Sequence, residues 1–182
     1  MAHVVFWRSQ VAHCRILAIH SDAARAMPGV IMVADGHDLA RICKPWVATL
    51  AHLAGMKSAP QYPLAIDRAC WQGEPVVAVV AETREQAEDA LQLVQVDFER
   101  LTPVVDMETA LDEGTPLIHP ELGDNLCFTR SLNVGNVDEA FAQADAVVES
   151  TFEFGRHTGV TLEPRSQICL LYTSPSPRDG LL

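Results

Sequence analysis

The sequence predicts a single α+β domain in which a mixed sheet carries short flanking helices. Its length of 182 residues is typical of one domain, and a chain of this size buries about two thirds of its unfolded surface. Between Ala65 and Glu99 a strand, a Gly-Glu-Pro turn, a second strand, a helix and a third strand follow one another, as in a βαβ-type unit. Helix starts of the capping-box kind recur at Thr83 and Asn136.

The central strand of this segment is apolar without interruption from Val76 to Ala81, which predicts a strand buried on both faces. The helix that follows is predicted from Thr83 to Leu93, because Gln86 stands three residues after Thr83. Its inward stripe, at helical spacing, comprises Ala87, Ala90, Leu91 and Val94.

The other predicted elements are also short. Strands are predicted at His3 to Arg8, Cys14 to Ile19, Val30 to Ala34, Ala65 to Trp71, Val94 to Phe98, Asn125 to Leu132, Ala146 to Gly155 and Thr161 to Ile168. Helices are predicted at Asp22 to Ala26, Met107 to Leu111 and Asp138 to Ala144. Proline and glycine interrupt residues 40–63, which predicts a long loop with one helical turn near Val47 to Ala54. A second loop is predicted at residues 115–125.

The net charge of −11 argues against nucleic acid and anionic membrane surfaces as partners, because both need a basic protein surface. No run approaches the ~20 apolar residues of a membrane helix, and no leader-like segment opens the sequence. We therefore expect no transmembrane segment.

Five cysteines are scattered along the chain, and no two of them form a CxxC pair: Cys14, Cys43, Cys70, Cys127 and Cys169. Their odd number and wide spacing predict reduced, mostly buried thiols in a cytoplasmic protein, not a disulfide framework. An iron–sulfur site needs clustered thiolates, so such a cluster would belong to another chain or domain.

Seven histidines raise the question of a metal site: His3, His13, His20, His37, His52, His119 and His157. No pair has HExxH or HxH spacing, so we predict no metal ligands and interpret His13 as a structural hydrogen-bonding residue. Ser9, His13 and Asp22 could form a hydrolytic triad on paper, but no nucleophile elbow surrounds any serine. The isolated glycines form no phosphate-binding loop: Gly29, Gly36 and Gly73.

Four segments stand in a recognisable order. The first is an early strand with Arg8-Ser9, Ala12-His13 and Arg15-Ile16, followed by a turn at Met27 to Val30. The second is the run GEPVVAVVAET, which begins at Gly73. The third is the helix at Asn136 to Phe141, and the fourth is the segment Leu162-Glu163-Pro164-Arg165. Together, over Ala2 to Ile168, they resemble the first α/β hammerhead domain of the molybdenum hydroxylases. This family comprises the large subunits of aldehyde oxidase, xanthine dehydrogenase and aerobic carbon monoxide dehydrogenase.

The resemblance implies a hammerhead domain at residues 1–155 and the start of a molybdopterin-binding region at residues 156–168. Such a large subunit binds a molybdenum–molybdopterin cofactor and acts on aldehydes, N-heterocycles or carbon monoxide, and electrons pass to [2Fe-2S] clusters and FAD in other subunits or domains. The family's glycine-rich cofactor segment, its later arginine-containing loop and its terminal glutamate are not among these residues. We therefore assign no catalytic, cofactor-binding or metal-binding residue, and expect an oligomeric parent enzyme and an inactive isolated chain.

Two polar features have structural interpretations. In the polar segment from Arg156 to Arg165, we expect Glu163 and Arg165 to be salt-bridged, either internally or against a further domain, because charges in a packed interface must be paired. An interdomain ion pair is preferred here to a position near the cofactor. Glu74 is interpreted as a turn residue rather than a general base, because a catalytic carboxylate needs a buried pocket.

The ends of the chain suggest that it is a fragment from near the start of a longer subunit. Met1 leads directly into strand-like sequence, and residues 169–182, which begin CLLYTSPSPRD, resemble translated sequencing-adapter DNA. A genuine Ser/Pro-rich tail is the other interpretation of this stretch. The alternative function is a stand-alone, non-catalytic binding or assembly domain with the same fold.

Overall fold

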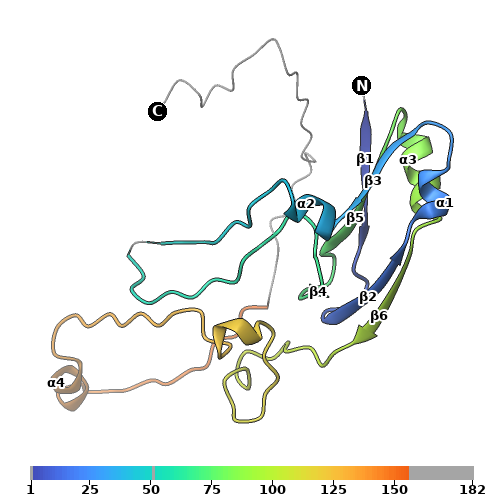
Figure 1. Cartoon of the computed structure of the whole chain (residues 1–182). Helices are drawn as coiled ribbons and strands as arrows, with labels where there is room; N and C mark the ends of the chain where they lie inside the picture. The colour runs from blue at the N-terminus through green and yellow to red at the C-terminus, as the bar shows by residue number, and fades with distance from the viewer. Residues whose placement is uncertain (1, 51, 156–182) are drawn as a thin grey trace, which may run out of the picture. The chain divides into compact units, whose positions relative to one another are not determined.

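The computed structural model describes residues 2–50 and 52–155. The chain divides into two compact units, Met1–Leu132 and Asn133–Leu182. All six described strands lie in the first unit, in two three-stranded sheets (Figure 1).

The first sheet has the order β1-β5-β3, with both pairs antiparallel. Its strands are β1 (His3–Arg8), β5 (Pro75–Ala81) and β3 (Val30–Asp35). Val79 of β5 lies opposite Val5 on one side and Val33 on the other. The predicted burial of the central strand on both faces is confirmed, since five of its seven residues are buried.

The second sheet has the order β4-β2-β6 and is also antiparallel: β4 (Arg68–Ala69), β2 (Cys14–His20) and β6 (Gln95–Arg100). The structure thus divides the expected mixed sheet into two antiparallel sheets. Because β5 and β6 belong to different sheets, the prediction of a βαβ-type unit is wrong. The predicted strand from Ala65 to Trp71 is reduced to its two β4 residues.

Helix α3 (Arg84–Leu91) connects the two sheets and packs on β1 and β5 (Figure 1). Its start is the predicted capping box, in which Thr83 Oγ1 accepts from Gln86 N and Gln86 Oε1 accepts from Thr83 N. The buried members of the core that α3 helps to enclose are Ala24, Val33, Ala65, Val76, Val77, Val79, Ala90 and Val94.

Two short helices flank β3. Helix α1 (Asp22–Arg25) is predicted almost to the residue, whereas α2 (Gly36–Ala40) is missing from the sequence-based prediction. Gly36 at its start lies so close to the backbone of Ala65 and Ile66 that a Cβ atom would collide with them, so only glycine fits.

The chain beyond β6 is less regular than predicted. It forms a 3-10 turn, η1 (Pro120–Leu122), and helix α4 (Val137–Ala142), which begins at the predicted cap Asn136. The strands predicted at Asn125 to Leu132 and Ala146 to Gly155 and the helix predicted at Met107 to Leu111 are not formed. An isolated strand gains no ladder partners, so alternation alone does not stabilise it. The strand predicted at Thr161 to Ile168 lies outside the described residues.

The loop predicted at residues 40–63 is present, and the backbones of Trp46 and Gln61 close it with two hydrogen bonds of 2.8 Å. A single turn, in which Leu53 N donates to the carbonyl of Leu50, matches the predicted helical turn. No helix within residues 2–50 and 52–155 combines the length and the apolar content that crossing a membrane requires.

Candidate functional site

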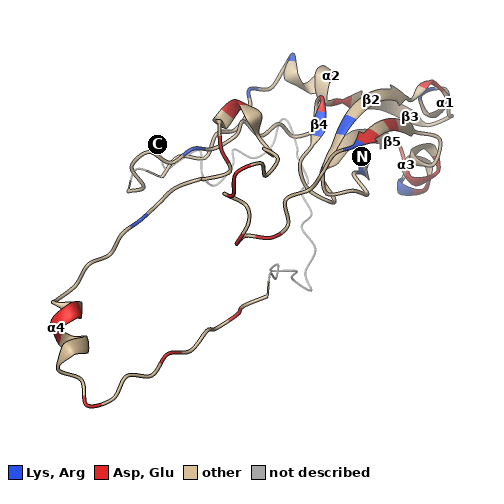
Figure 2. Cartoon of the chain, turned by 90° about the horizontal axis from the view of Figure 1, so that it is seen from below, with Lys and Arg blue, Asp and Glu red and all other residues tan. Residues whose placement is uncertain are grey.

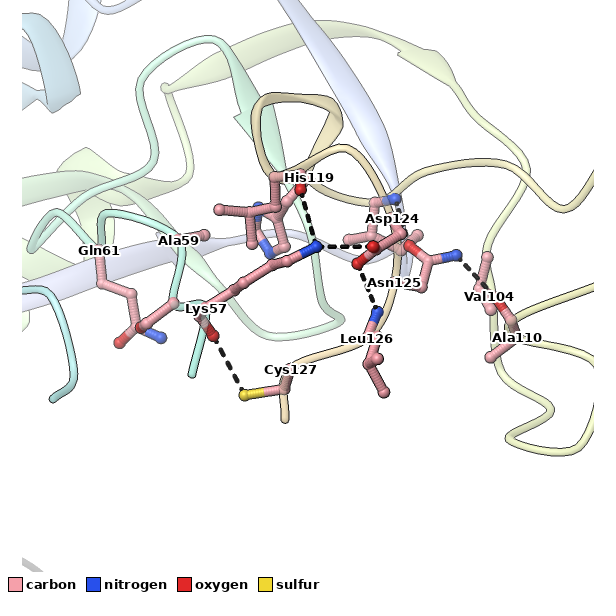
Figure 3. A pocket seen from close by; sticks show the side chains of 13 residues that line it. Lys57, Ala59, Gln61, Val104, Ala110, His119, Asp124, Asn125, Leu126 and Cys127 are labelled. Carbon is pink, nitrogen blue, oxygen red and sulfur yellow. Dashed lines mark hydrogen bonds and ion pairs between the residues drawn. The ribbon is translucent and has the colours of Figure 1, made fainter. Parts of the chain in front are cut away.

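A cavity of about 350 Å³ in the first unit is the candidate site (Figure 3). Two loops that are far apart in the sequence, residues 57–61 and residues 104–127, provide its walls. Its lining residues are Lys57, Ser58, Ala59, Gln61, Val104, Ala110, Ile118, His119, Leu122, Asp124, Asn125, Leu126 and Cys127.

Lys57 fastens the first loop to the second. Its Nζ lies 2.6 Å from Oδ2 of Asp124 and donates to the carbonyl of Leu122 at 3.3 Å, as the dashed lines of Figure 3 show in part. Its backbone N donates to the carbonyl of Cys127 at 2.8 Å, and the Cys127 thiol donates to the carbonyl of Lys57 at 3.1 Å. The hydrogen bond from Lys57 lowers the pKa of the Asp124 carboxyl.

The Asn125 side chain stabilises the second loop through three hydrogen bonds. Its Oδ1 accepts from Ile118 N at 3.2 Å, while its Nδ2 donates to the carbonyls of Ala110 and Pro116 at 3.0 Å each. One side chain thus satisfies three backbone groups that no helix or strand pairs. Without periodicity in this loop, nothing in the sequence pattern singles out Asn125.

The chemistry of this cavity favours binding over catalysis. The side chains of Val104, Ile118, Leu122 and Leu126 make its wall mainly apolar. The one ammonium group on its wall, Lys57, is already paired with Asp124, so it offers no free charge to a ligand. Such a wall suits a small, mostly apolar molecule, with Gln61 and His119 as polar contacts.

A second cavity of about 420 Å³ shares Gln61 and His119 with the first and extends to the turn before β5. At this turn, Glu74 Oε2 accepts from Cys70 N at 2.6 Å, so Glu74 has the turn role that the sequence predicts. Burial raises the pKa of the Glu74 carboxyl. Burial, followed by the Glu74 charge, raises the pKa of the Cys70 thiol to about 11.

The structure does not bring Ser9, His13 and Asp22 together as a hydrolytic triad. Ser9 Oγ donates to the carbonyl of Val11 at 2.7 Å, and His13 Nδ1 lies 3.0 Å from the carbonyl of Thr102. Asp22 stands in the first turn of α1. His13 is therefore the structural hydrogen-bonding residue that the sequence predicts, and its buried Nε2 has no protein partner in the described part of the chain.

Three other histidines each pair with a single carboxylate. His20 lies 2.9 Å from Asp97, while His37 and His119 lie 3.4 Å from Asp67 and Glu121. Within the described ranges, no group of three or more histidine, cysteine or acidic side chains could hold a metal ion.

The four described cysteines are free thiols, as predicted, but only Cys14 is buried. The prediction of mostly buried thiols is therefore wrong for these four. The predicted pair of Glu163 and Arg165, with the whole segment from Arg156 to Arg165 and His157, lies outside the described residues and stays a prediction.

Two family models match consecutive parts of the chain. The model described as "Aldehyde oxidase and xanthine dehydrogenase, a/b hammerhead domain" matches residues 1–102. The model described as "Molybdopterin cofactor-binding domain" matches residues 118–175, a range that includes most of the cavity-lining residues of the second loop. The predicted domain boundary at residue 155 stays a prediction.

Curated relatives and solved structures agree with the family models. The chain is 37% identical to the nicotine 6-hydroxylase large subunit of Paenarthrobacter nicotinovorans, over 90% of this chain and 20% of that protein. It is 31% identical to a carbon monoxide dehydrogenase large chain of Afipia carboxidovorans, over 83% of this chain and 20% of that protein. The structure of quinoline 2-oxidoreductase from Pseudomonas putida 86 superimposes with a TM-score of 0.74 at 37% identity, over 81% of this chain and 18% of that chain.

The chain thus spans about a fifth of the length of these relatives. The match to the hammerhead model covers more than half of the chain, and the two-sheet fold agrees with it. The chain therefore belongs to the aldehyde oxidase and xanthine dehydrogenase family, whose α/β hammerhead domain it contains.

Proposed function

We propose that the chain is part of the molybdopterin-binding large subunit of a molybdenum-dependent hydroxylase. The observation that carries this proposal is the order of the two family models, in which the hammerhead domain precedes the molybdopterin cofactor-binding domain. The relatives support it, since their names include a nicotine hydroxylase, a carbon monoxide dehydrogenase and an aldehyde oxidase.

The proposed substrates of the parent enzyme are N-heterocycles, aldehydes or carbon monoxide. The apolar cavity between residues 57–61 and 104–127 supports a role of this domain in the wall of the substrate path. In that role its side chains exclude water and orient an apolar molecule, while the cofactor supplies the redox chemistry when bound.

The proposed partners are iron–sulfur and flavin subunits or domains that take up the electrons. Two relatives are named as a subunit of a complex and as a large chain, which supports a parent enzyme of several subunits. We further propose a cytoplasmic location, which the four free thiols support, because unpaired cysteines are typical of reducing compartments.

The described part of the cofactor-domain match, residues 118–155, does not itself fit the phosphate of the cofactor. Molybdopterin carries a phosphate, which needs cationic or N–H donors around it. Residues 118–155 contain seven acidic residues and one arginine, Arg130, and their acidic groups are seen on α4 and around η1 (Figure 2). We therefore propose that other parts of the parent subunit hold the cofactor, and that the isolated chain is inactive.

The test is the molybdenum content of the complete subunit. The full gene is expressed with its neighbouring subunit genes, and bound molybdenum is measured by mass spectrometry beside a preparation of the present chain. We expect about one molybdenum per complete subunit, little in the isolated chain, and oxidation of quinoline, an aldehyde or carbon monoxide with an artificial electron acceptor by the complete enzyme alone.

The alternative, a non-catalytic binding or assembly domain, makes the opposite prediction. A full-length protein that purifies without molybdenum, and a gene with no glycine-rich cofactor segment downstream, would establish that alternative. The tail at residues 169–182 is tested by the same gene sequence, because ordinary coding sequence at these codons contradicts an adapter origin.

A further inference from the structure

The cavity of about 420 Å³ beside the β5 turn differs from the first in its charge. Two aromatic side chains, Tyr62 and Trp71, contribute to its lining. The same lining contains three carboxylates, Asp67, Glu74 and Glu121, which belong to three separate segments of the chain.

The described lining contains one permanent cation, Arg68, and its guanidinium is bonded to a backbone carbonyl. The Arg68 guanidinium donates from Nη1 to the carbonyl of Ile118 at 3.1 Å. In the part of the chain that the structure describes, Asp67 and Glu121 have only histidines as ion-pair partners, each at 3.4 Å. Among the residues that the structure describes, no lysine or arginine forms an ion pair with any of the three carboxylates. With neutral histidines the lining therefore carries a net charge of about −2.

Glu74 is the least exposed of the three carboxylates. It is half-buried, and its Oε2 is fixed by the backbone N–H of Cys70 at 2.6 Å. A carboxylate that is partly removed from water is destabilised unless an opposite charge or further hydrogen bonds compensate. The backbone donors fix its orientation, so it presents a pre-oriented negative charge to the cavity.

The aromatic side chains of the lining offer a ligand its apolar contacts. Trp71 is 53% exposed although it lies at the cavity, and it packs over the Gly73 turn, where a Cβ atom would stand 3.5 Å from its ring. An indole face next to carboxylates attracts a cation and also covers an alkyl chain.

We propose that this cavity binds an organic cation, an alkylammonium or alkylguanidinium group, whose charged head meets Glu74 and whose alkyl stem lies against Trp71 and Tyr62. Such a group is the end of a free amine or of a basic side chain on a partner protein. The inference uses only this cavity and is independent of the proposed molybdenum chemistry, so either can fail without the other.

The experiment is a ¹H–¹⁵N NMR titration of the chain at pH 7 and constant chloride concentration. The probes are n-butylammonium and n-butylguanidinium chloride, and n-butanol and sodium butyrate serve as matched neutral and anionic controls. We expect saturable shifts at the Trp71 indole N–H and at the Cys70 amide with both cations, in the millimolar range, and none with the controls.

Substitutions test whether the cations bind in this cavity. Glu74→Gln retains an acceptor for Cys70 N but removes the charge, and we expect it to weaken cation binding at least about tenfold. Trp71→Leu should weaken it about two- to fivefold. Glu113→Gln, an exposed carboxylate outside the cavity, is the control and should leave the affinity unchanged. If circular dichroism shows that Glu74→Gln is unfolded, Glu121→Gln takes its place with an expected several-fold loss.

Two outcomes separate the sources of the cation. If the peptide acetyl-Gly-Lys-Gly-amide binds as tightly as butylammonium, the cavity accepts a basic side chain of a partner. If butylammonium binds and the peptide does not, the ligand is a free amine. The inference is overturned if no saturable shift occurs, if n-butanol shifts the same signals, or if the cavity variants bind cations as the Glu113→Gln control does.

Discussion

At the scale of single residues, one carboxylate shapes both the turn before β5 and the reactivity of a neighbouring thiol. Glu74 holds the backbone of Cys70 at 2.6 Å, and its negative charge adds to the effect of burial on the Cys70 thiol. A thiolate beside a carboxylate is disfavoured, because both carry negative charge in a partly desolvated place. The sequence predicts the turn role of Glu74, but the effect on Cys70 depends on a contact that only the folded chain creates.

Cys70 is therefore expected to react slowly with iodoacetamide. With its pKa at about 11, the thiol is almost entirely protonated at pH 8.5, whereas the unfolded chain has the ordinary value of 9.0. Allowing for the greater intrinsic nucleophilicity of a high-pKa thiolate, alkylation of Cys70 in the folded chain should be about tenfold slower than in urea. Peptide mass spectrometry over a time course measures both rates.

The pH dependence supplies the control for this prediction. The rate at Cys70 should keep rising as the pH approaches 11, because the thiolate population grows until that point. Glu74→Gln removes one of the causes of the raised pKa and should speed alkylation at pH 8.5. Equal rates in the folded and the unfolded chain would show that the thiol is not protected by its surroundings.

At the scale of elements, sequence patterns succeed where an element has its own start signal or a strong apolar run. β1, β5 and α3 are predicted within a few residues, because β5 is apolar throughout and α3 has a capping box and a stripe. α2 is missed because five residues are too few for periodicity, although Asp35 and Asp38 form a capping box that could have revealed it.

Patterns fail where an element depends on a partner. The stretch from Ala146 to Gly155 is rich in β-formers, yet none of its residues belongs to a strand of the described structure. The candidate site is unpredictable for a related reason. Lys57 meets Asp124 and Cys127 across about 70 residues of chain, and no local pattern specifies such a contact.

The central strand gives the sharpest element-scale prediction. Val77 is fully buried in β5, so Val77→Asp places a carboxylate without a partner in the core and should cost about 3–5 kcal/mol of unfolding free energy. A domain of this size is stabilised by about 5–15 kcal/mol, so the variant should be largely unfolded or melt far below the parent. Urea titration followed by circular dichroism measures the difference.

Val4→Asp is the matched control, because it makes the same substitution in a neighbouring strand at a side chain that is 49% exposed. Its effect should stay within about 1 kcal/mol, since the carboxylate remains in water. If Val77→Asp and Val4→Asp melted alike, β5 would not be the interior strand that the structure describes.

At the scale of the whole molecule, the two units differ in how many of their described side chains are buried. In Met1–Leu132 the core residues of the first sheet and of α3 are sealed from water, and Val77 to Ala81 of β5 have strand partners on both sides. In the described part of the second unit, residues 133–155, every residue is exposed, including Val148 at 88% and Phe152 at 81%. Apolar side chains in water contribute no burial energy, so residues 133–155 gain little stability from their own packing.

Amide hydrogen exchange should report this difference directly. Among the described residues, the amides of residues 145–154 have no backbone hydrogen-bond partner in a helix or strand, so they should exchange within about a factor of ten of the unfolded rate. The β5 amides, bonded to β1 and β3, should exchange more than about a thousandfold slower.

In the complete subunit that we propose, residues 145–154 should become protected, because the remaining polypeptide would cover Val147, Val148 and Phe152, while β5 protection stays as it is. Mass spectrometry of exchanged peptides from both proteins measures this protection. If residues 145–154 were protected in the isolated chain, or unprotected in the complete subunit, the remaining polypeptide would not be what covers these side chains.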